Sequence, residues 1–122
     1  MKMDILYCRR SMTISKGLKK WDIWYANVKF EDSNDFKLRP VLIYNETTCV
    51  VISFKMTSVD RGDNKTEYHV REWAKAGLSK PTSIRLDKVL RLQQRDFVRR
   101  IGRLSAADIL QLELRLASRS NH

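Results

Sequence analysis

The sequence contains few of the residues from which metal sites, phosphate-binding loops and disulfides are built. It has only four glycines, two cysteines and two histidines. Four scattered glycines provide no glycine-rich loop of the kind that cradles a phosphate. His69 and His122 have no cysteine or carboxylate at metal-ligand spacing, and a nucleophilic triad is equally hard to assemble around them. We therefore expect no metal and no cofactor.

The cysteines and the lack of long apolar runs bear on the cellular compartment. Cys8 and Cys49 are too few for a disulfide framework, and Cys49 falls in a segment with the composition of a buried strand, so reduced thiols are favoured over a disulfide. The sequence shows neither a signal-peptide segment nor an apolar run that would span a membrane. These features indicate a cytoplasmic protein.

Positive charge dominates the composition. Over 122 residues, 24 Lys and Arg outweigh 14 Asp and Glu, which gives a formal net charge of +10. Such an excess favours an anionic partner, whether nucleic acid, an acidic protein segment or a membrane surface. The excess lies at the two ends, because residues 21–84 hold nine charges of each sign.

The length fits one compact domain. Residues 1–18 show no sustained periodicity, and we expect a basic N-terminal extension that is flexible or partly helical, with contact to nucleic acid as the alternative. Residues 19–119 are predicted to form the single domain, which ends in a helix, and residues 120–122 a short tail.

The middle of the chain has the composition of antiparallel strands. β-branched and aromatic residues dominate 21–30 (WDIWYANVKF), 39–45 (RPVLIYN) and 48–56 (TCVVISFKM), and the last two are predicted to pair. Pro40 holds Arg39 extended at the start of an apolar run, so we expect its guanidinium at a rim, where it can bind an anion.

Shorter elements follow. Residues 67–70 are predicted to be an edge strand, 71–78 a short helix that ends at Gly77, and 80–92 a strand in which Arg85 and Asp87 share one side. A helical turn at 93–97 and a last strand at 98–104 come next.

The chain ends in a predicted amphipathic helix over residues 105–118. Ser105 is suited to the N-cap, and Asp108 places a negative charge in the first turn. The apolar stripe that faces the core is expected to include Ile109, Leu112 and Leu116 and to be widened by Leu110 and Leu114.

Five blocks, taken in order, resemble the MazF/PemK (Kid) family of toxins from toxin–antitoxin modules. The resemblance runs from about Lys20 to Leu116. The blocks are WDIWYANV, RPVLI, the apolar strand that ends in Met56-Thr57-Ser58, AGLSKPTSIRLDKVLRL, and RIGRLS before the final helix.

The resemblance implies a compact, SH3-like antiparallel β-barrel with a C-terminal helix, usually paired as a homodimer. It also implies a metal-independent endoribonuclease that cuts single-stranded RNA at short sequences and leaves a 2′,3′-cyclic phosphate and a 5′-hydroxyl. A cognate antitoxin with an acidic, disordered C-terminal segment would neutralise such a toxin.

Site residues follow by position. Arg39 matches the arginine of the family's RP motif and Thr57 its catalytic Thr or Ser, while Arg85 and Asp87 match the acid and the base of the Kid branch. Asp87 is the candidate base, although its pKa would have to rise for efficient proton abstraction. The expected RNA contacts are Asp35, Lys37, Ser58 and Lys88.

Three departures from the family pattern leave an alternative open. Asn34 stands where the family's loop usually has a glutamate, Trp21 replaces the opening glycine, and Lys88 replaces a common glutamine. The alternative is a weak or inactive member that binds RNA or an acidic partner protein without cleavage.

Overall fold

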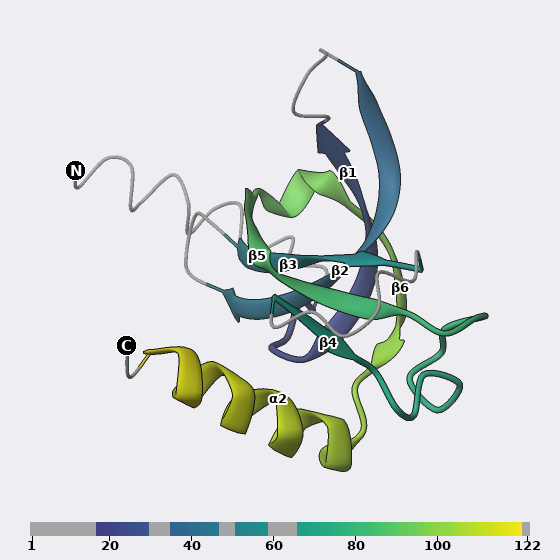
Figure 1. The fold of residues 1–122 in the computed structure, drawn as a ribbon. Coiled ribbons are helices and arrows are strands. Elements are labelled where there is room, and N and C mark those ends of the chain that lie inside the picture. The colour runs from purple at the N-terminus through teal and green to yellow at the C-terminus, as the bar shows by residue number, and fades with distance from the viewer. Residues whose placement is uncertain (1–16, 30–34, 47–50, 59–65, 121–122) are drawn as a thin grey trace.

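The computed structural model describes residues 17–29, 35–46, 51–58 and 66–120. One antiparallel sheet and one C-terminal helix make up the fold (Figure 1), which confirms the predicted mainly β class. The elements are β1 (Asp22–Lys29), β2 (Phe36–Glu46), β3 (Val51–Thr57), β4 (Glu67–His69), β5 (Ser83–Leu92), the 3₁₀ turn η1 (Gln94–Asp96), β6 (Phe97–Arg103) and α2 (Ala106–Ser120).

The sheet has the strand order β4-β5-β3-β2-β1-β6. Within the described part of the chain β4 and β6 are therefore its edges, so the sheet does not close on itself. The predicted edge position of β4, the helical turn before β6 and the strand β6 itself are confirmed. Strand β2 is longer than predicted, since it begins at Phe36 and carries Arg39 within the ladder.

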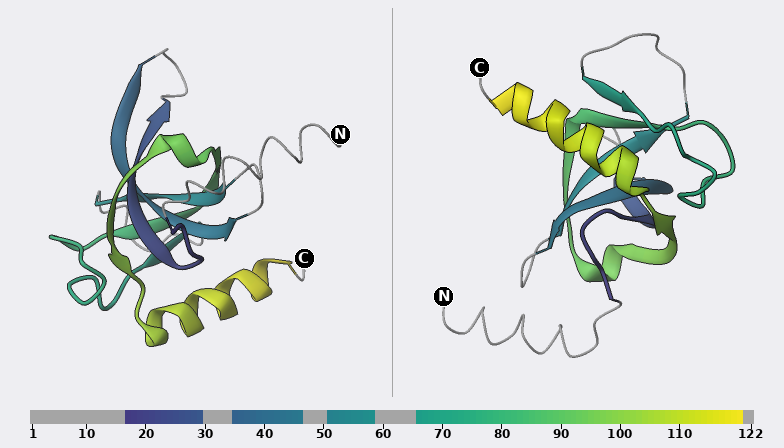
Figure 2. Two further views of the ribbon diagram at one scale, coloured as in Figure 1. Left: turned by 180° about the vertical axis from the view of Figure 1, so that it is seen from behind. Right: turned by 90° about the horizontal axis from the view of Figure 1, so that it is seen from below.

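Two apolar clusters hold the sheet. One includes Ile23, Leu42 and Ile84 and extends to Leu112 of α2, which runs along one side of the sheet (Figures 1 and 2). The other is built around Trp24 and Phe97, whose rings meet edge to face at 6.2 Å. Because both faces of the central strands are covered, their apolar residues show little alternation.

The backbone at Trp21 has a left-handed conformation, with φ of 76°. Its N–H donates to the carbonyl of Ile43 at 2.7 Å, and its carbonyl accepts from the N–H of Leu104 at 3.1 Å. Trp21 thus joins β2 to the end of β6. The resemblance to the MazF/PemK family places a glycine at this position, and glycine adopts a left-handed conformation without strain.

Helix α2 begins as predicted, but its exposed side is more apolar than expected. The N–H of Asp108 donates to Ser105 Oγ at 3.2 Å, which is an N-cap bond. Ile109, Leu112 and Leu116 pack against the sheet. The prediction that Leu110 and Leu114 widen this stripe is wrong, because each is 57% exposed.

The prediction of a short helix over residues 71–78 is also wrong, because residues 71–77 form turns. This segment lies against β6: a Cβ on Gly102 would come 1.9 Å from the carbonyl oxygen of Ala76. Gly77 has a φ of +94°, and a Cβ on it would come 2.5 Å from the carbonyl oxygen of Ile101. The close approach of two backbones therefore places residues 78–80 beside β6.

Several sequence-based predictions fall outside the described residues. They concern the extension, most of which is residues 1–16, the two cysteines Cys8 and Cys49, and Asn34 in the loop before β2.

Candidate functional site

A groove of about 600 Å³ lies where β2 and β3 meet the 77–80 segment and β6. Three of the predicted site residues, Arg39, Thr57 and Ser58, line it together. Its other charged lining residues are Lys55, Lys80, Arg99 and Arg100. The charged side chains that line this groove are therefore all positive.

Strand β2 presents Arg39 to this groove from a rigid base. Val41, Leu42 and Ile43 are fully buried, whereas the Arg39 side chain is exposed. Arg39 pairs with Ala26 of β1, and Pro40 with Tyr25. Because the following residues are fixed in the core, the backbone that carries the exposed Arg39 side chain is held rigidly, as anion recognition requires.

Strand β6 contributes two arginines with different surroundings. Arg99 stacks its guanidinium on the ring of Tyr25 at 5.1 Å from the ring centre, which orients the charge at the groove wall. Arg100 makes an ion pair of 3.3 Å with the buried carboxylate of Asp22, which also holds Arg103 at 3.2 Å. Arg99 and Arg100 belong to the C-terminal excess of positive charge noted in the sequence, whereas no sequence pattern pointed to Lys55 or Lys80.

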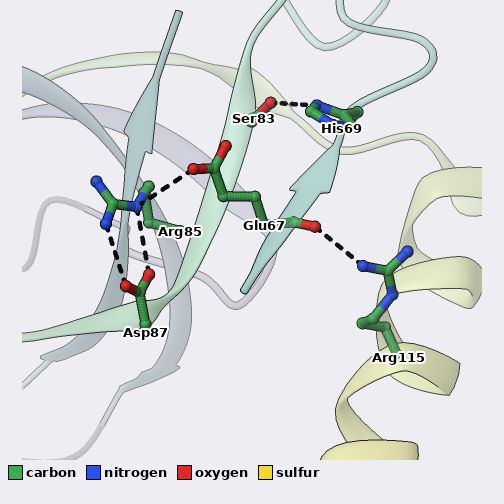
Figure 3. Close-up of polar contacts among 6 residues, drawn as sticks. All are labelled: Glu67, His69, Ser83, Arg85, Asp87 and Arg115. Carbon is green, nitrogen blue, oxygen red and sulfur yellow. Dashed lines mark hydrogen bonds and ion pairs between the residues drawn. The ribbon is translucent and has the colours of Figure 1, made fainter. Parts of the chain in front are cut away.

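Arg85 and Asp87 form a tight pair, but Arg85 does not line the groove. Its Nε and Nη2 donate to the two oxygens of Asp87 at 3.2 and 3.1 Å. On its other side Nε lies 3.7 Å from the buried carboxylate of Glu67 on β4. Figure 3 shows the guanidinium between these two acids. With a side-chain exposure of 9%, Arg85 is largely withdrawn from solvent.

The contact with Arg85 lowers the pKa of Asp87, the candidate base. Hydrogen bonding from Arg85 lowers the pKa of Asp87 below its ordinary value, an effect that partial burial opposes and the charges of Arg85 and Lys88 reinforce. This is the opposite of the rise that efficient proton abstraction needs.

A second pocket, of about 270 Å³, holds Asp87 and Lys88, and Lys55 lines both pockets. An irregularity in the pairing of β3 and β5 creates this arrangement. Phe54 pairs with Val89, but the next residue, Lys55, pairs with Arg85, so three residues of β5 are left over. Such bulges re-aim side chains and are common beside functional sites.

The remaining predicted contacts lie elsewhere. Asp35 and Lys37 are exposed at the start of β2, and neither lines the two pockets just described. His69 Nδ1 lies 2.6 Å from Ser83 Oγ (Figure 3), a contact that no sequence pattern predicted. Ser83 of β5 pairs with Thr57 of β3 on one side and with His69 of β4 on the other. Thr57, Ser83 and His69 thus form a row of polar residues that reaches the β4 edge of the sheet.

Asp108 anchors the wall that carries residues 77–80. It accepts hydrogen bonds from Tyr68 Oη at 2.6 Å and from the N–H groups of Arg71 and Glu72 at 3.0 and 2.9 Å. Burial raises the pKa of Asp108, but the hydrogen bonds from Tyr68, Arg71, Glu72 and Ser105 outweigh it, so that the pKa lies below its ordinary value.

Two kinds of feature are absent from the described residues. They contain no group of three or more His, Cys, Asp or Glu that would hold a metal ion. None of the helices described is long and apolar enough to cross a membrane.

Comparison with known proteins gives a consistent result. The sequence model of the family described as PemK-like, MazF-like toxin of type II toxin–antitoxin system matches residues 19–119. A comparison with curated proteins found no match.

Solved structures resemble the fold closely. The Mycobacterium tuberculosis toxin MazF-mt6 is 26% identical over 80% of this chain and 93% of its own, with a TM-score of 0.62. An endoribonuclease in complex with its cognate antitoxin, from a Mycobacterial species, has a TM-score of 0.64 over 84% of this chain and 93% of its own. At 14% identity, this second likeness concerns the fold alone.

Proposed function

This chain belongs to the PemK-like, MazF-like toxins of type II toxin–antitoxin systems, and we propose that it is a metal-independent endoribonuclease that cuts single-stranded RNA. The observation that carries the proposal is the groove in which Arg39, Thr57 and Ser58 lie among four further cations. A polyanionic strand is the substrate that such a surface attracts, and base-independent phosphate contacts provide most of the affinity.

The proposed reaction is an internal transesterification. The 2′-oxygen attacks phosphorus and loses its proton to a base, while the bond from phosphorus to the 5′-oxygen breaks and that oxygen takes up a proton. The products are a 2′,3′-cyclic phosphate and a 5′-hydroxyl. Negative charge grows on the non-bridging oxygens of the phosphate in the transition state, so fixed donors aimed at these oxygens accelerate the step.

Arg39 and Thr57 suit the role of these donors. A guanidinium supplies charge-assisted hydrogen bonds, and loss of one such donor typically lowers a rate about a hundredfold. The Thr57 hydroxyl adds a neutral hydrogen bond from the facing strand. Ser58 and Lys88 are proposed to contact flanking phosphates, and Asp35 and Lys37 to contact RNA beyond the groove.

Asp87 remains the proposed base and Arg85 the proposed acid. Because the two side chains are hydrogen-bonded to each other, we expect each to contribute less to the rate than it would alone. A carboxylate with a lowered pKa is ionised at neutral pH and can accept a proton, yet it is a weaker base than one with a raised pKa. Arg85 is shared between two acids and lies outside the groove. We therefore expect substitution of Asp87 to cost less activity than substitution of Arg39.

The proposed partners follow from the family. The toxin would act in the cytoplasm, assemble as a homodimer and be neutralised by a cognate antitoxin. An acidic, disordered antitoxin segment would find the same basic groove that RNA uses, so inhibitor and substrate would compete.

One observation favours a second candidate function. The engagement of Asp87 and Arg85 with each other favours a protein that binds RNA or an acidic protein segment without cutting it. Turnover distinguishes the two functions, whereas salt dependence does not, because both bind phosphate or carboxylate through Lys and Arg.

The test is incubation of the purified protein with a long unstructured RNA in the presence of EDTA, followed by mapping of the ends. Arg39→Ala, Asp87→Ala and the control Lys75→Met are assayed alongside. Cleavage at a recurring short sequence, with cyclic phosphate ends and lost in Arg39→Ala, is the expected result. Intact RNA with a folded wild-type protein would reject the ribonuclease and support the binding-only function.

A further inference from the structure

The chain offers a cation for the reacting phosphate that the family resemblance did not indicate, namely Lys55. This inference rests on the proposed ribonuclease function and names one more residue of the same site. Lys55 is half-buried on β3, two residues before Thr57, so both side chains project from the same side of the strand.

Lys55 occupies the junction of the two pockets. It lines the groove with Arg39 and Thr57, and it lines the smaller pocket with Asp87 and Lys88. An RNA strand that passes from one pocket to the other would therefore pass its ammonium group. A lysine ammonium presents three hydrogen-bond donors on a flexible stem, which suits a phosphate oxygen whose position shifts during reaction.

Arg85 is poorly placed for the same task. Arg85 is the direct cross-strand partner of Lys55, and like charges in such positions repel each other. The guanidinium is instead held by Asp87 at 3.1 Å and faces Glu67 at 3.7 Å, and its side chain is 9% exposed. The two carboxylates offset the Arg85 charge and so make the neighbouring position favourable for a second cation.

We propose that Lys55 is a catalytic residue that binds a non-bridging oxygen of the scissile phosphate together with Arg39, a contact that the buried Arg85 is poorly placed to make. Lys55 transfers no proton in this assignment. It stabilises the charge that develops on the phosphorus oxygens as the 2′-oxygen bond forms and the 5′-oxygen bond breaks.

The test compares Lys55→Met with the control Lys75→Met. Lys75 is an exposed lysine paired with Glu72, whose backbone N–H binds Asp108 near the start of α2. Each variant loses one positive charge. Single-turnover cleavage at saturating protein measures the chemical step, and fluorescence anisotropy of a labelled single-stranded RNA measures binding over a range of salt concentrations.

We expect Lys55→Met to lower the single-turnover rate about a hundredfold and to reduce the slope of log affinity against log salt by about 0.7. Lys55→Arg should restore most of the rate, and Lys75→Met should match the wild type. If Lys55→Met does not fold, Lys55→Gln replaces it, with folding checked by circular dichroism.

An unchanged single-turnover rate in Lys55→Met would overturn the assignment, whether or not its RNA binding weakens. A rate that falls in Arg85→Met but not in Lys55→Met would give the phosphate contact to Arg85 instead. If the wild type cuts no RNA, the proposed function fails, and an unchanged salt slope in Lys55→Met would separately remove Lys55 from the phosphate contacts.

Discussion

Asp108 is expected to be the most costly polar residue to replace, because it links α2, β4 and the turn segment that carries the groove wall. Its side chain is 1% exposed and receives Tyr68 Oη, Arg71 N–H and Glu72 N–H. Asp108→Ala leaves these three donors without their carboxylate. A hydrogen bond to a charged group contributes about 1.5–3 kcal/mol, and water replaces part of the hydrogen bonding that the exposed Arg71 loses.

We therefore expect Asp108→Ala to lower the free energy of unfolding by about 4 kcal/mol, and Asp108→Asn by about 2 kcal/mol. For a domain whose total stability is about 5–15 kcal/mol, this loss is large. Urea unfolding followed by circular dichroism measures it. The matched control is Asp96→Ala, which removes a carboxylate that accepts one bond, from the N–H of Gln93, and should cost about 1 kcal/mol.

The pH dependence gives a second check. The pKa of Asp108 in the folded protein is lowered, so the ionised form stabilises the fold fully above the unfolded value of about 3.9 and loses this effect as pH falls through the folded pKa. The stability gap between wild type and Asp108→Asn should therefore be largest at neutral pH and shrink below about pH 4. A cost under about 1 kcal/mol for Asp108→Ala, or a gap that grows in acid, would refute the reasoning.

Three further predictions concern packing, and each is measured by chemical or thermal unfolding. Gly102→Ala places a methyl group 1.9 Å from the carbonyl oxygen of Ala76, so it should cost about 3 kcal/mol; an unchanged melting temperature would contradict the close approach. At Trp21, with φ of 76°, Gly should be more stable than Ala by about 1 kcal/mol, and the reverse order would show that the backbone is not left-handed. Leu112→Ala should cost about 3 kcal/mol, whereas Leu114→Gln should change stability by less than about 0.5 kcal/mol; equal costs would place Leu114 in the core.

The strands and the final helix were predictable because the composition of a strand and the cap of a helix are set by residues close together in the sequence. Trp24, Val41 and Ile43 lie in runs whose composition suits strands covered on both faces. Ser105 and Asp108 give the start of α2 through residues only three apart. The position of Arg39 at the mouth of a buried run depends on Pro40 and on its immediate neighbours, so it too was expected.

The errors arose where distant segments decide the outcome. Residues 71–78 favour a helix locally, but hydrogen bonds to Asp108 and packing against Gly102 hold residues 71–77 in turns. The periodicity of α2 could not show how wide its buried stripe is, because that width is set by the sheet that covers it.

The candidate site was predicted only in part, because some of its contacts also join segments that are distant in the sequence. The pairing of Arg85 with Asp87 lies within one strand, whereas Glu67 reaches Arg85 from β4, a contact that strand order alone creates. Lys55 was missed because its position depends on the irregular pairing of β3 with β5. Register of this kind is set by contacts across the sheet, not by the alternation within a strand.

The most direct test of the central claim uses two versions of one RNA oligonucleotide that the wild type cuts, identical except for a 2′-deoxy sugar at the cleavage site. Cleavage is followed under single-turnover conditions in EDTA, with Arg39→Ala assayed on the unmodified oligonucleotide. The account predicts that the deoxy version is bound but not cut, and that Arg39→Ala cuts the unmodified RNA about a hundredfold more slowly. Cleavage of both versions at the same rate, or an Arg39→Ala rate equal to that of the wild type, would contradict it.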